Sequence, residues 1–207
     1  MSRSWQTAWV TGASSGIGEA IARELMRGGT MVAASARSEE KLEALAAESH
    51  GKAVSFPLDV TDTDAVAARV AEIEADMGEI DLAVLSAGTW EPFDLDNFSA
   101  EPFAKTMAVN YMGVVNAVAA VLPRMRARGR GHIAIVASVA GYVGLIKAES
   151  YGPTKAALIN FAEGLKVDLN GTGVTLSIIC PGFVDTPLVK DNDFPMPFIM
   201  QPEEAGR

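Results

Sequence analysis

The junction between an apolar segment and a helical segment near the N-terminus constrains this chain more than any other part of its sequence. Residues 11–18 read TGASSGIG, an apolar run precedes them, and a helical pattern starts at Glu19. Gly12 and Gly16 let the backbone turn tightly and approach a pyrophosphate group, which the following helix N-terminus receives through its free N–H groups and its dipole. Gly18 permits close packing of the helix on the sheet. Although the spacing is G-x-x-x-G-x-G rather than G-x-G-x-x-G, and such a turn alone is often only a loop, the pattern predicts an α/β fold with an anion-binding first turn.

Strand-like and helical segments alternate along the whole chain. We expect strands near residues 6–10, 30–36, 53–57, 81–86, 132–137 and 174–180. We expect helices near residues 16–28, 39–49, 63–77, 100–128 and 151–170, with shorter helical pieces from about 185 onward. Several strand segments are short apolar runs without clean alternation, as in a parallel sheet that is covered on both faces. Right-handed crossovers then give a doubly wound parallel sheet, the Rossmann fold, with strand order 3-2-1-4-5-6.

The length and the composition predict one domain over residues 1–207. A chain of 207 residues that is 49% hydrophobic can bury one substantial core and leaves little for a second. Its net charge of −9 argues against a nucleic-acid surface, which needs clustered basic residues. The two histidines, His50 and His132, have no carboxylate or cysteine at metal-ligand spacing, so we expect no metal.

The single cysteine and the N-terminal residues bear on the compartment. Cys180 cannot form an intrachain disulfide, and its place at the end of an apolar strand suggests a small buried side chain rather than a nucleophile. Residues 1–6 lead into the first strand without a signal-peptide core. The longest apolar stretch, 107–123, is interrupted by Asn110 and Asn116 and is too short to span a bilayer. We therefore expect a soluble, cytoplasmic protein.

A second motif lies in the C-terminal half, where Tyr151 and Lys155 stand four residues apart, thirteen residues after Ser138. In a helix this spacing places the phenol and the ammonium on one face, one turn apart. A phenol with an ordinary pKa of about 10 is a poor base near neutrality, and a fixed ammonium beside it favours the phenolate. We therefore expect Tyr151 to exchange protons with an alcohol or a ketone. Taken alone, such a pair is more often a solvated surface pair.

Together, the TGASSGIG turn, Ser138 and the run YGPTK over 151–155 resemble the short-chain dehydrogenase/reductase family over essentially the whole chain. Leu58-Asp59-Val60 and the run PGFVDT over 181–186 reinforce the resemblance. It implies that hydride passes between a nicotinamide dinucleotide and a carbonyl or alcohol carbon. The implied catalytic residues are Asn110, Ser138, Tyr151 and Lys155. By this resemblance Tyr151 moves the proton, Lys155 lowers the pKa of Tyr151 and holds the nicotinamide ribose, Ser138 orients the substrate oxygen, and Asn110 holds a relay water.

The end of the second strand favours one form of the dinucleotide. An acid there would bind the ribose 2′-hydroxyl and repel a 2′-phosphate, whereas an arginine accommodates the phosphate. This chain has Ala36 and Arg37 at that place and no acid before Glu39, so we expect NADP(H), with Ser14 and Ser38 as helpers. The alternative is that Arg37 is a surface residue that opens the next helix. The resemblance implies the following cofactor-binding residues: Gly12, Ser14, Ser15, Gly16, Ile17, Gly18, Arg37, Asp59, Val60, Ala87, Gly88, Tyr151, Lys155, Pro181, Gly182, Val184 and Thr186.

Asp59 allows a second interpretation, and the residues before Ala87 depart from the family pattern. Asp59, which the family places near the adenine amino group, can also cap the helix that begins after Thr61-Asp62. Before Ala87-Gly88 the family has two asparagines, and this chain has Leu85 and Ser86 instead. Their side-chain hydrogen bonds to the sheet are therefore lost, and Ser86 is the candidate to replace one of them.

The segment 183–200 is expected to close the site as a substrate lid. It is rich in apolar side chains for a loop, and Trp90 is a further candidate for the same pocket. The apolar residues either cover a lipophilic carbonyl or alcohol, or pack against neighbouring helices or a second subunit. We weigh these two readings evenly.

Taken together, the sequence predicts an NADP(H)-dependent carbonyl reductase or alcohol dehydrogenase with a small-molecule, lipophilic substrate. A related dehydratase or epimerase is the rival among enzymes. The rival from another class is a non-catalytic NADP(H)-binding regulatory or scaffold protein, which turnover would distinguish. Family members usually continue through a further helix and a final edge strand, so we expect that strand to be missing from this chain. We also expect a homodimer or homotetramer that pairs the helices near 100–128 and 156–169 with those of a second subunit.

Overall fold

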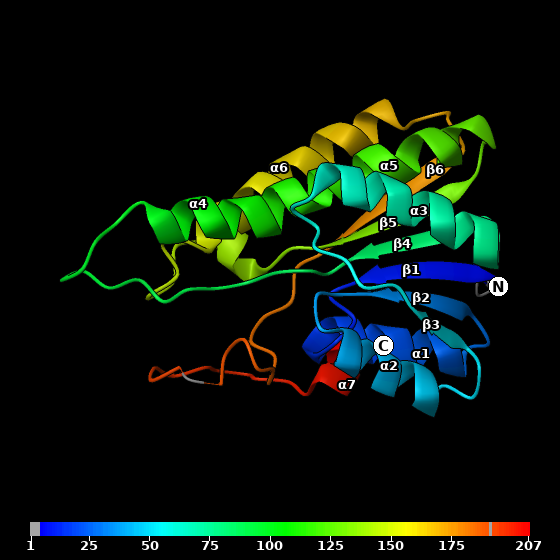
Figure 1. The fold of residues 1–207 in the computed structure, drawn as a ribbon. Coiled ribbons are helices and arrows are strands. Elements are labelled where there is room, and N and C mark those ends of the chain that lie inside the picture. The colour runs from blue at the N-terminus through cyan, green and yellow to red at the C-terminus, as the bar shows by residue number, and fades with distance from the viewer. Residues whose placement is uncertain (1–4, 191) are drawn as a thin grey trace.

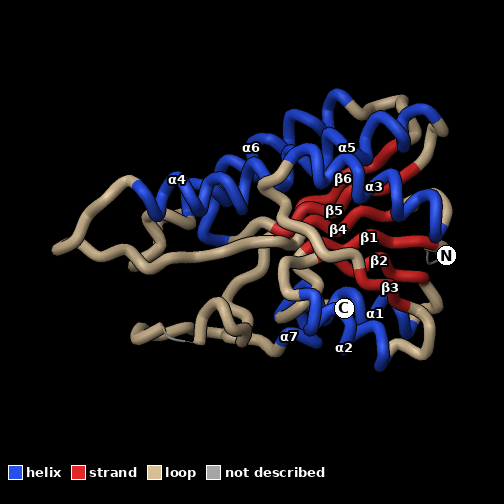
Figure 2. Tube along the Cα trace, in the orientation of Figure 1, coloured by secondary structure: helices blue, strands red, loops and turns tan. Residues whose placement is uncertain are grey.

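The computed structural model describes residues 5–190 and 192–207 and shows six parallel strands in one sheet, in the order β3-β2-β1-β4-β5-β6. The strands are β1 (Thr7–Thr11), β2 (Met31–Ser35), β3 (Ala53–Ser55), β4 (Leu82–Leu85), β5 (Gly131–Val136) and β6 (Val174–Ile179). The main helices are α1 (Gly16–Arg27), α2 (Glu39–Glu48), α3 (Thr63–Met77), α4 (Glu101–Met107), α5 (Gly113–Ala127), α6 (Gly152–Asp168) and α7 (Pro202–Ala205). Figures 1 and 2 show helices on both faces of the sheet. The doubly wound fold and its strand order are confirmed.

The two faces of the sheet are covered by different helices. In Figure 1, α1, α2 and α7 lie on one side, and α3, α5 and α6 lie on the other. Each side has its own apolar core: Val10, Val32 and Leu42 belong to the first, and Trp9 and Ile133 to the second. Successive side chains of a strand point to opposite faces, so neighbours such as Trp9 and Val10 enter different cores. Because both faces are covered, the strands are nearly continuous apolar runs.

The expected helix over 100–128 is interrupted by a π-helical segment at Ala108–Met112 between α4 and α5. A π segment inserts one extra residue into a helix and is frequent at functional sites. By length and mean hydropathy alone, the run Glu101–Ala127 would be long enough to cross a membrane. Here it covers the sheet and contributes Val114, Val118 and Val121 to the core, as a core helix does.

The expectation of helical pieces from about 185 is wrong for most of that segment. The described residues after Phe183 form a loop with extended and turn structure until α7 begins at Pro202. The backbone N–H of Asp185 donates to the carbonyl of Met200 at 2.9 Å, and the N–H of Met200 donates to the carbonyl of Phe183 at 3.0 Å. We call this pairing the neck of the loop. Prolines at 187, 195 and 197 remove the N–H groups that a helix would need.

Candidate active site

The glycine-rich turn after β1 has the backbone geometry that its sequence predicts. Gly12 and Gly16 adopt φ angles of 71° and 58°, the left-handed region in which a side chain is strained. A Cβ on Gly12 would lie 2.9 Å from the backbone of Ala87, and one on Gly18 would lie 2.3 Å from the carbonyl oxygen of Gly12. Gly18 therefore packs on the turn itself rather than on the body of the sheet. The three glycines form a close-packed backbone cradle at the start of α1.

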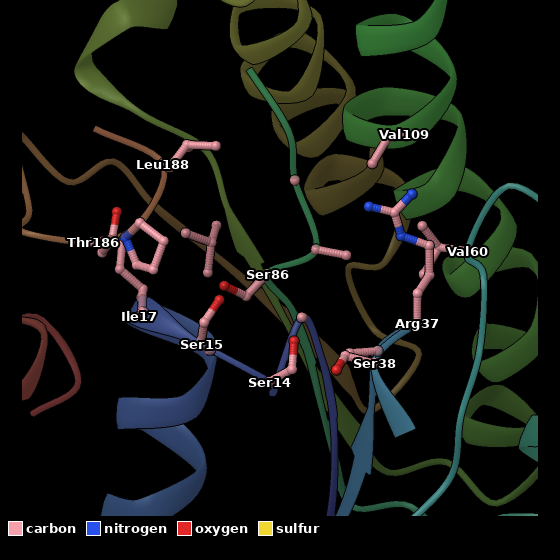
Figure 3. A pocket seen from close by; sticks show the side chains of 18 of the residues that line it. Ser14, Ser15, Ile17, Arg37, Ser38, Val60, Ser86, Val109, Thr186 and Leu188 are labelled. Atoms are coloured by element: carbon pink, nitrogen blue, oxygen red, sulfur yellow. The ribbon is translucent and has the colours of Figure 1, made fainter. Parts of the chain in front are cut away.

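A cavity of about 430 Å³ opens above this cradle. It lies beyond the carboxyl ends of β1, β2 and β4, where the strand order reverses and where doubly wound folds bind their ligands. Figure 3 shows Arg37 and Val60 on one side of it and Ile17 and Thr186 on the other. Of the residues predicted to bind the cofactor, the following line this cavity: Gly12, Ser14, Ser15, Gly16, Ile17, Gly18, Arg37, Asp59, Val60, Ala87, Gly88, Tyr151, Lys155 and Thr186.

Arg37 and Asp59 stand at the same end of the cavity. Hydrogen bonds from Thr61, first from its backbone N–H at 2.9 Å, lower the pKa of Asp59 against its desolvation, and the positive charge of Arg37 adds to this effect. The suggestion that Asp59 caps the following helix is wrong. Asp62 is the N-cap of α3 and accepts from the N–H of Ala65 at 2.9 Å. The carboxylate of Asp59 instead accepts hydrogen bonds from the backbone N–H and the hydroxyl of Thr61, and Asp59 lines the large cavity.

The other end of the cavity holds Tyr151 and Lys155. Tyr151 is the N-cap residue of α6, so Lys155 follows it by about one helical turn. The Nζ of Lys155 lies 5.3 Å from the centroid of the Tyr151 ring and donates to the carbonyl of Val136 at 3.0 Å. Ser138 is the N-cap of a short 3₁₀ turn after β5, where its Oγ accepts from the N–H of Ala140 at 3.1 Å. Strand β5, the turn that follows it and α6 thus meet at a buried amine beside a phenol.

The pKa of Tyr151 shifts in the opposite direction to the one that we expected. Burial raises the pKa of Tyr151 to about 12, and a hydrogen bond with Ser138 only partly offsets the rise. Burial also lowers the pKa of Lys155 to about 8. We expected the ammonium to lower the pKa of the phenol. Desolvation outweighs that attraction in the protein alone, because it penalises the phenolate and the ammonium together.

Asn110 lines neither cavity but lies directly behind them, in the π segment. Its side chain is fully buried, and its Oδ1 accepts from the N–H of Thr89 at 2.7 Å. Its Nδ2 donates to the carbonyl of Thr89 at 2.9 Å and to the Oγ1 of Thr154 at 3.1 Å. A Cβ on Gly88 would lie 3.4 Å from Asn110 Oδ1 and 3.9 Å from Lys155 Nζ. The amide therefore clamps the chain after β4 to α6, next to the amine.

A second, smaller cavity of about 110 Å³ adjoins the first. Tyr151, Thr186 and Ile17 line both cavities. Ser138, Pro181, Gly182 and Val184 line only the smaller one, so three of the residues predicted to bind cofactor face the apolar space instead. Its other walls are mostly apolar and include Trp90, Leu145, Ile146, Phe183, Leu188, Val189 and Phe194.

Only part of the expected lid covers this cavity. Leu188, Val189 and Phe194 line it, as does Trp90. Phe198, by contrast, is 96% exposed, and Ile199 is also exposed. The apolar residues up to Phe194 therefore border the cavity, whereas Phe198 and Ile199 are exposed.

A family profile described as short chain dehydrogenase matches residues 6–194. The chain belongs to the short-chain dehydrogenase/reductase family. It is 40% identical over 205 residues to an uncharacterized oxidoreductase of Myxococcus xanthus (strain DK1622), a match that covers 98% of this chain and 81% of the relative.

Two solved structures are similar to this chain. One is a variant of actinorhodin polyketide ketoreductase with NADPH, at a TM-score of 0.89 and 29% identity, covering 100% of this chain and 89% of the other. The other is the closed form of a serine dehydrogenase complexed with NADP+, at a TM-score of 0.87 and 29% identity, covering 97% of this chain and 86% of the other. This chain is therefore an oxidoreductase of the short-chain dehydrogenase/reductase type.

Three residues that hold the site in place were not predicted from the sequence. The Oγ1 of Thr11 accepts from the N–H groups of Ser86 and Ala87 at 3.1 and 3.2 Å, so Thr11 joins the ends of β1 and β4. Asn116 is buried and donates to the carbonyl of Val60 at 3.0 Å. Thr154 is the buried partner of Asn110 described above. Of these three residues, only Thr11 had a signal in the sequence, because it is a polar residue at the end of an apolar strand.

The other two tyrosines of the chain, Tyr111 and Tyr142, line neither cavity. Tyr142 is 66% exposed and its hydroxyl contacts the Sγ of Cys180 at 3.4 Å, while Tyr111 packs edge-on against Phe161. Cys180 is half-buried rather than buried, which corrects our expectation. Among the described residues, no group of three or more His, Cys, Asp or Glu side chains is placed to hold a metal ion.

Proposed function

We propose that this protein is an NADP(H)-dependent carbonyl reductase or alcohol dehydrogenase that acts on a small, largely apolar substrate. One observation carries the proposal: Tyr151 lines both the large cavity above the glycine turn and the small apolar cavity. Lys155 belongs to the first cavity and Ser138 to the second, so the phenol stands at the boundary between a dinucleotide site and a substrate site. The proposal includes a single catalytic domain over 1–207 and a cytoplasmic location, the latter resting on the single cysteine.

The residues of the large cavity fit a dinucleotide. The cradle of Gly12, Gly16 and Gly18 has no room for side chains, which suits close approach of a pyrophosphate to the backbone and to the N-terminus of α1. Arg37 suits a 2′-phosphate, with Ser14 and Ser38 beside it. Two structural relatives were solved with NADPH or NADP+, which supports the same choice here.

The bound nicotinamide would supply or accept the hydride. The chain's own part is to hold the substrate oxygen near the hydroxyls of Tyr151 and Ser138 and to move one proton at the Tyr151 hydroxyl. Lys155 Nζ, anchored on the carbonyl of Val136, is placed to stabilise negative charge as it develops on the phenol. The apolar walls of the small cavity exclude water, which strengthens these interactions.

The proposal is tested by ketone reduction with each dinucleotide, in the wild type and in Arg37→Ala. We expect NADPH to bind about ten- to a hundredfold more tightly than NADH, since a charge-assisted phosphate contact contributes about 1.5–3 kcal/mol. Fluorescence titration measures the affinities, and loss of reduced dinucleotide measures turnover over a panel of ketones. Arg37→Ala should remove most of the NADPH preference while NADH affinity stays level.

Lys41→Ala is the matched control, because Lys41 is an exposed cation on α2 that does not line the cavity. Equal affinities for the two dinucleotides would overturn the assignment of NADP(H). Absence of turnover on every ketone and alcohol, together with tight NADPH binding, would favour the non-catalytic alternative.

We also propose that two copies of the chain associate through α5 and α6. Five of the apolar residues on or next to these helices belong to the core of the single chain, namely Val114, Val118, Val121, Leu158 and Leu169. A stripe at Met112, Val115, Ala119 and Leu122 stays exposed or half-buried, and it has helical spacing. Such a stripe suits a self-complementary two-fold contact.

Light scattering at micromolar concentration should therefore give at least twice the monomer mass of 21.8 kDa. Met112→Glu places a charge at the 44% exposed position of this stripe and should give the monomer mass. Val54→Glu, an exposed apolar position on the opposite edge strand β3, should leave the mass unchanged. A wild-type mass near the monomer's would refute the association.

A further inference from the structure

Asn192 is the polar side chain of the small cavity that the proposed mechanism does not use. The cavity's polar lining otherwise consists of Ser138, Tyr151 and Thr186, all assigned to the reaction or to the dinucleotide side. The Oδ1 of Asn192 is buried and has no hydrogen-bond partner among the described residues. A buried amide oxygen without a donor is costly, and in native proteins such groups often mark a ligand contact.

The neighbouring contacts fix the orientation of this amide. Its Nδ2 donates to the Sδ of Met196 at 3.4 Å. A thioether can accept but not donate, so interchanging the two amide atoms would leave the oxygen facing an acceptor. The observed orientation is therefore the favourable one, and the unsatisfied atom is an acceptor. Asn192 lines the small cavity, so this unsatisfied acceptor belongs to a residue of the cavity wall.

The adjacent residue ties this part of the loop to the opposite wall. Asp193 accepts from the Nζ of Lys147 at 2.7 and 2.8 Å through its two carboxylate oxygens. The carbonyl of Lys147 in turn accepts from the indole N–H of Trp90 at 3.0 Å and from the N–H of Phe93 at 3.3 Å. The same residue thus connects the loop that carries Asn192 with the wall that carries Trp90. The ion pair next to Asn192 therefore ties its part of the loop to the segment around Lys147.

We propose that Asn192 is a specificity-determining residue whose Oδ1 accepts a hydrogen bond from the substrate. This inference rests on the proposed function and deepens it. The substrate is then a carbonyl compound, or its alcohol, that carries a hydroxyl group on a short apolar chain. The carbonyl oxygen faces Tyr151 and Ser138, the apolar carbons face the Trp90 side, and the second hydroxyl donates to Asn192. An all-hydrocarbon ketone would leave the amide oxygen buried and unpaired, so it should react less efficiently.

The test compares hydroxy ketones with isosteres in which a methyl group replaces the hydroxyl. The probes are 4-hydroxybutan-2-one against pentan-2-one, and 6-hydroxyhexan-2-one against heptan-2-one, each reduced with NADPH. For at least one pair, the wild type should show a kcat/KM about tenfold higher for the hydroxy ketone, the usual size of one neutral hydrogen bond. Asn192→Leu should bring this ratio to about one. Asn192→Asp, which keeps an acceptor at the same place, should retain a preference for the hydroxyl.

Because each ratio compares two substrates on the same variant, effects of the substitution on folding or cofactor binding cancel in the ratio. Asn170→Leu, at an exposed position after α6, is the matched control and should keep the wild-type ratio. Wild-type ratios near one for both pairs, or a ratio that persists in Asn192→Leu, would overturn the inference and leave the proposed function standing. If no ketone turns over at all, the proposed function fails, and saturation-transfer NMR with the same four compounds then decides the inference. It requires stronger binding of a hydroxy ketone than of its isostere, in the wild type but not in Asn192→Leu.

Discussion

Tyr151→Phe should lower the turnover of any ketone that the enzyme accepts by about 10²–10⁴-fold, the usual contribution of general acid–base catalysis. The substitution keeps the ring at the boundary of the two cavities and removes only the hydroxyl that moves the proton in the proposed mechanism. Dinucleotide affinity should barely change, because the glycine turn and Arg37 are untouched. Steady-state kinetics with NADPH measure the loss, and fluorescence titration measures the affinity.

Tyr142→Phe provides the matched control, since Tyr142 is exposed and lines neither cavity. Its turnover should remain near the wild-type value. Near-normal turnover of Tyr151→Phe on any accepted substrate would show that another group carries the proton, and the assignment of the mechanism would then be wrong.

Lys155→Met should stabilise the protein without ligand near pH 7, and the gain should vanish as the pH rises. Burial lowers the pKa of Lys155 from 10.5 to about 8, so between these values the unfolded chain binds a proton that the folded chain does not. Stability rises with pH wherever the unfolded state binds more protons. At about 1.4 kcal/mol per pKa unit, the wild type bears a penalty of about 3 kcal/mol below pH 8 that it loses toward pH 10.5. The lost hydrogen bond to the carbonyl of Val136 offsets about 1 kcal/mol of the gain in the variant.

Urea unfolding of both proteins between pH 7 and about 9.5 measures the difference. Tyr151, with a folded pKa of about 12 against about 10 for a free phenol, is present in both proteins, so its own titration largely cancels in the difference. Lys166→Met, at an exposed position on the same helix, should show no comparable change with pH. A difference between Lys155→Met and the wild type that is constant over this range would contradict the desolvation of the amine. The same variant should lose turnover, so stability and activity are opposed at this residue.

Much of the fold and of the dinucleotide cavity followed from local patterns. Apolar runs separated by helical segments gave the strand order, and the glycines of 11–18 gave the turn, because left-handed φ angles and the absence of a Cβ are properties of single residues. Tyr151 and Lys155 were found for the same reason, since helical spacing alone places them on one face. Each of these features is determined by a few consecutive residues.

The remaining features depend on contacts between distant parts of the chain. Thr11 is identified only through the two amides after β4, and Asn116 only through the carbonyl of Val60. The π segment could not be predicted either, because helix propensity does not distinguish it from α-helix. In the structure it carries Asn110, which contacts Thr89 and Thr154. The direction of the Tyr151 pKa could not be read from its neighbour Lys155 either. It is set by how completely the fold removes both groups from water.

The neck between Phe183–Asp185 and Met200 holds together the two ends of the loop that forms one wall of the small cavity. Its two ends are joined by backbone hydrogen bonds, so they do not depend on which side chains lie between them. A replacement of different length and composition could be grafted there as a cassette, because doubling the length of a loop costs only about 0.6 kcal/mol in closure entropy. Thr186, which packs on Gly16, marks the boundary that such a graft should respect. Exchange of this segment would therefore change one wall of the small cavity and leave the glycine turn, Tyr151 and Lys155 as they are.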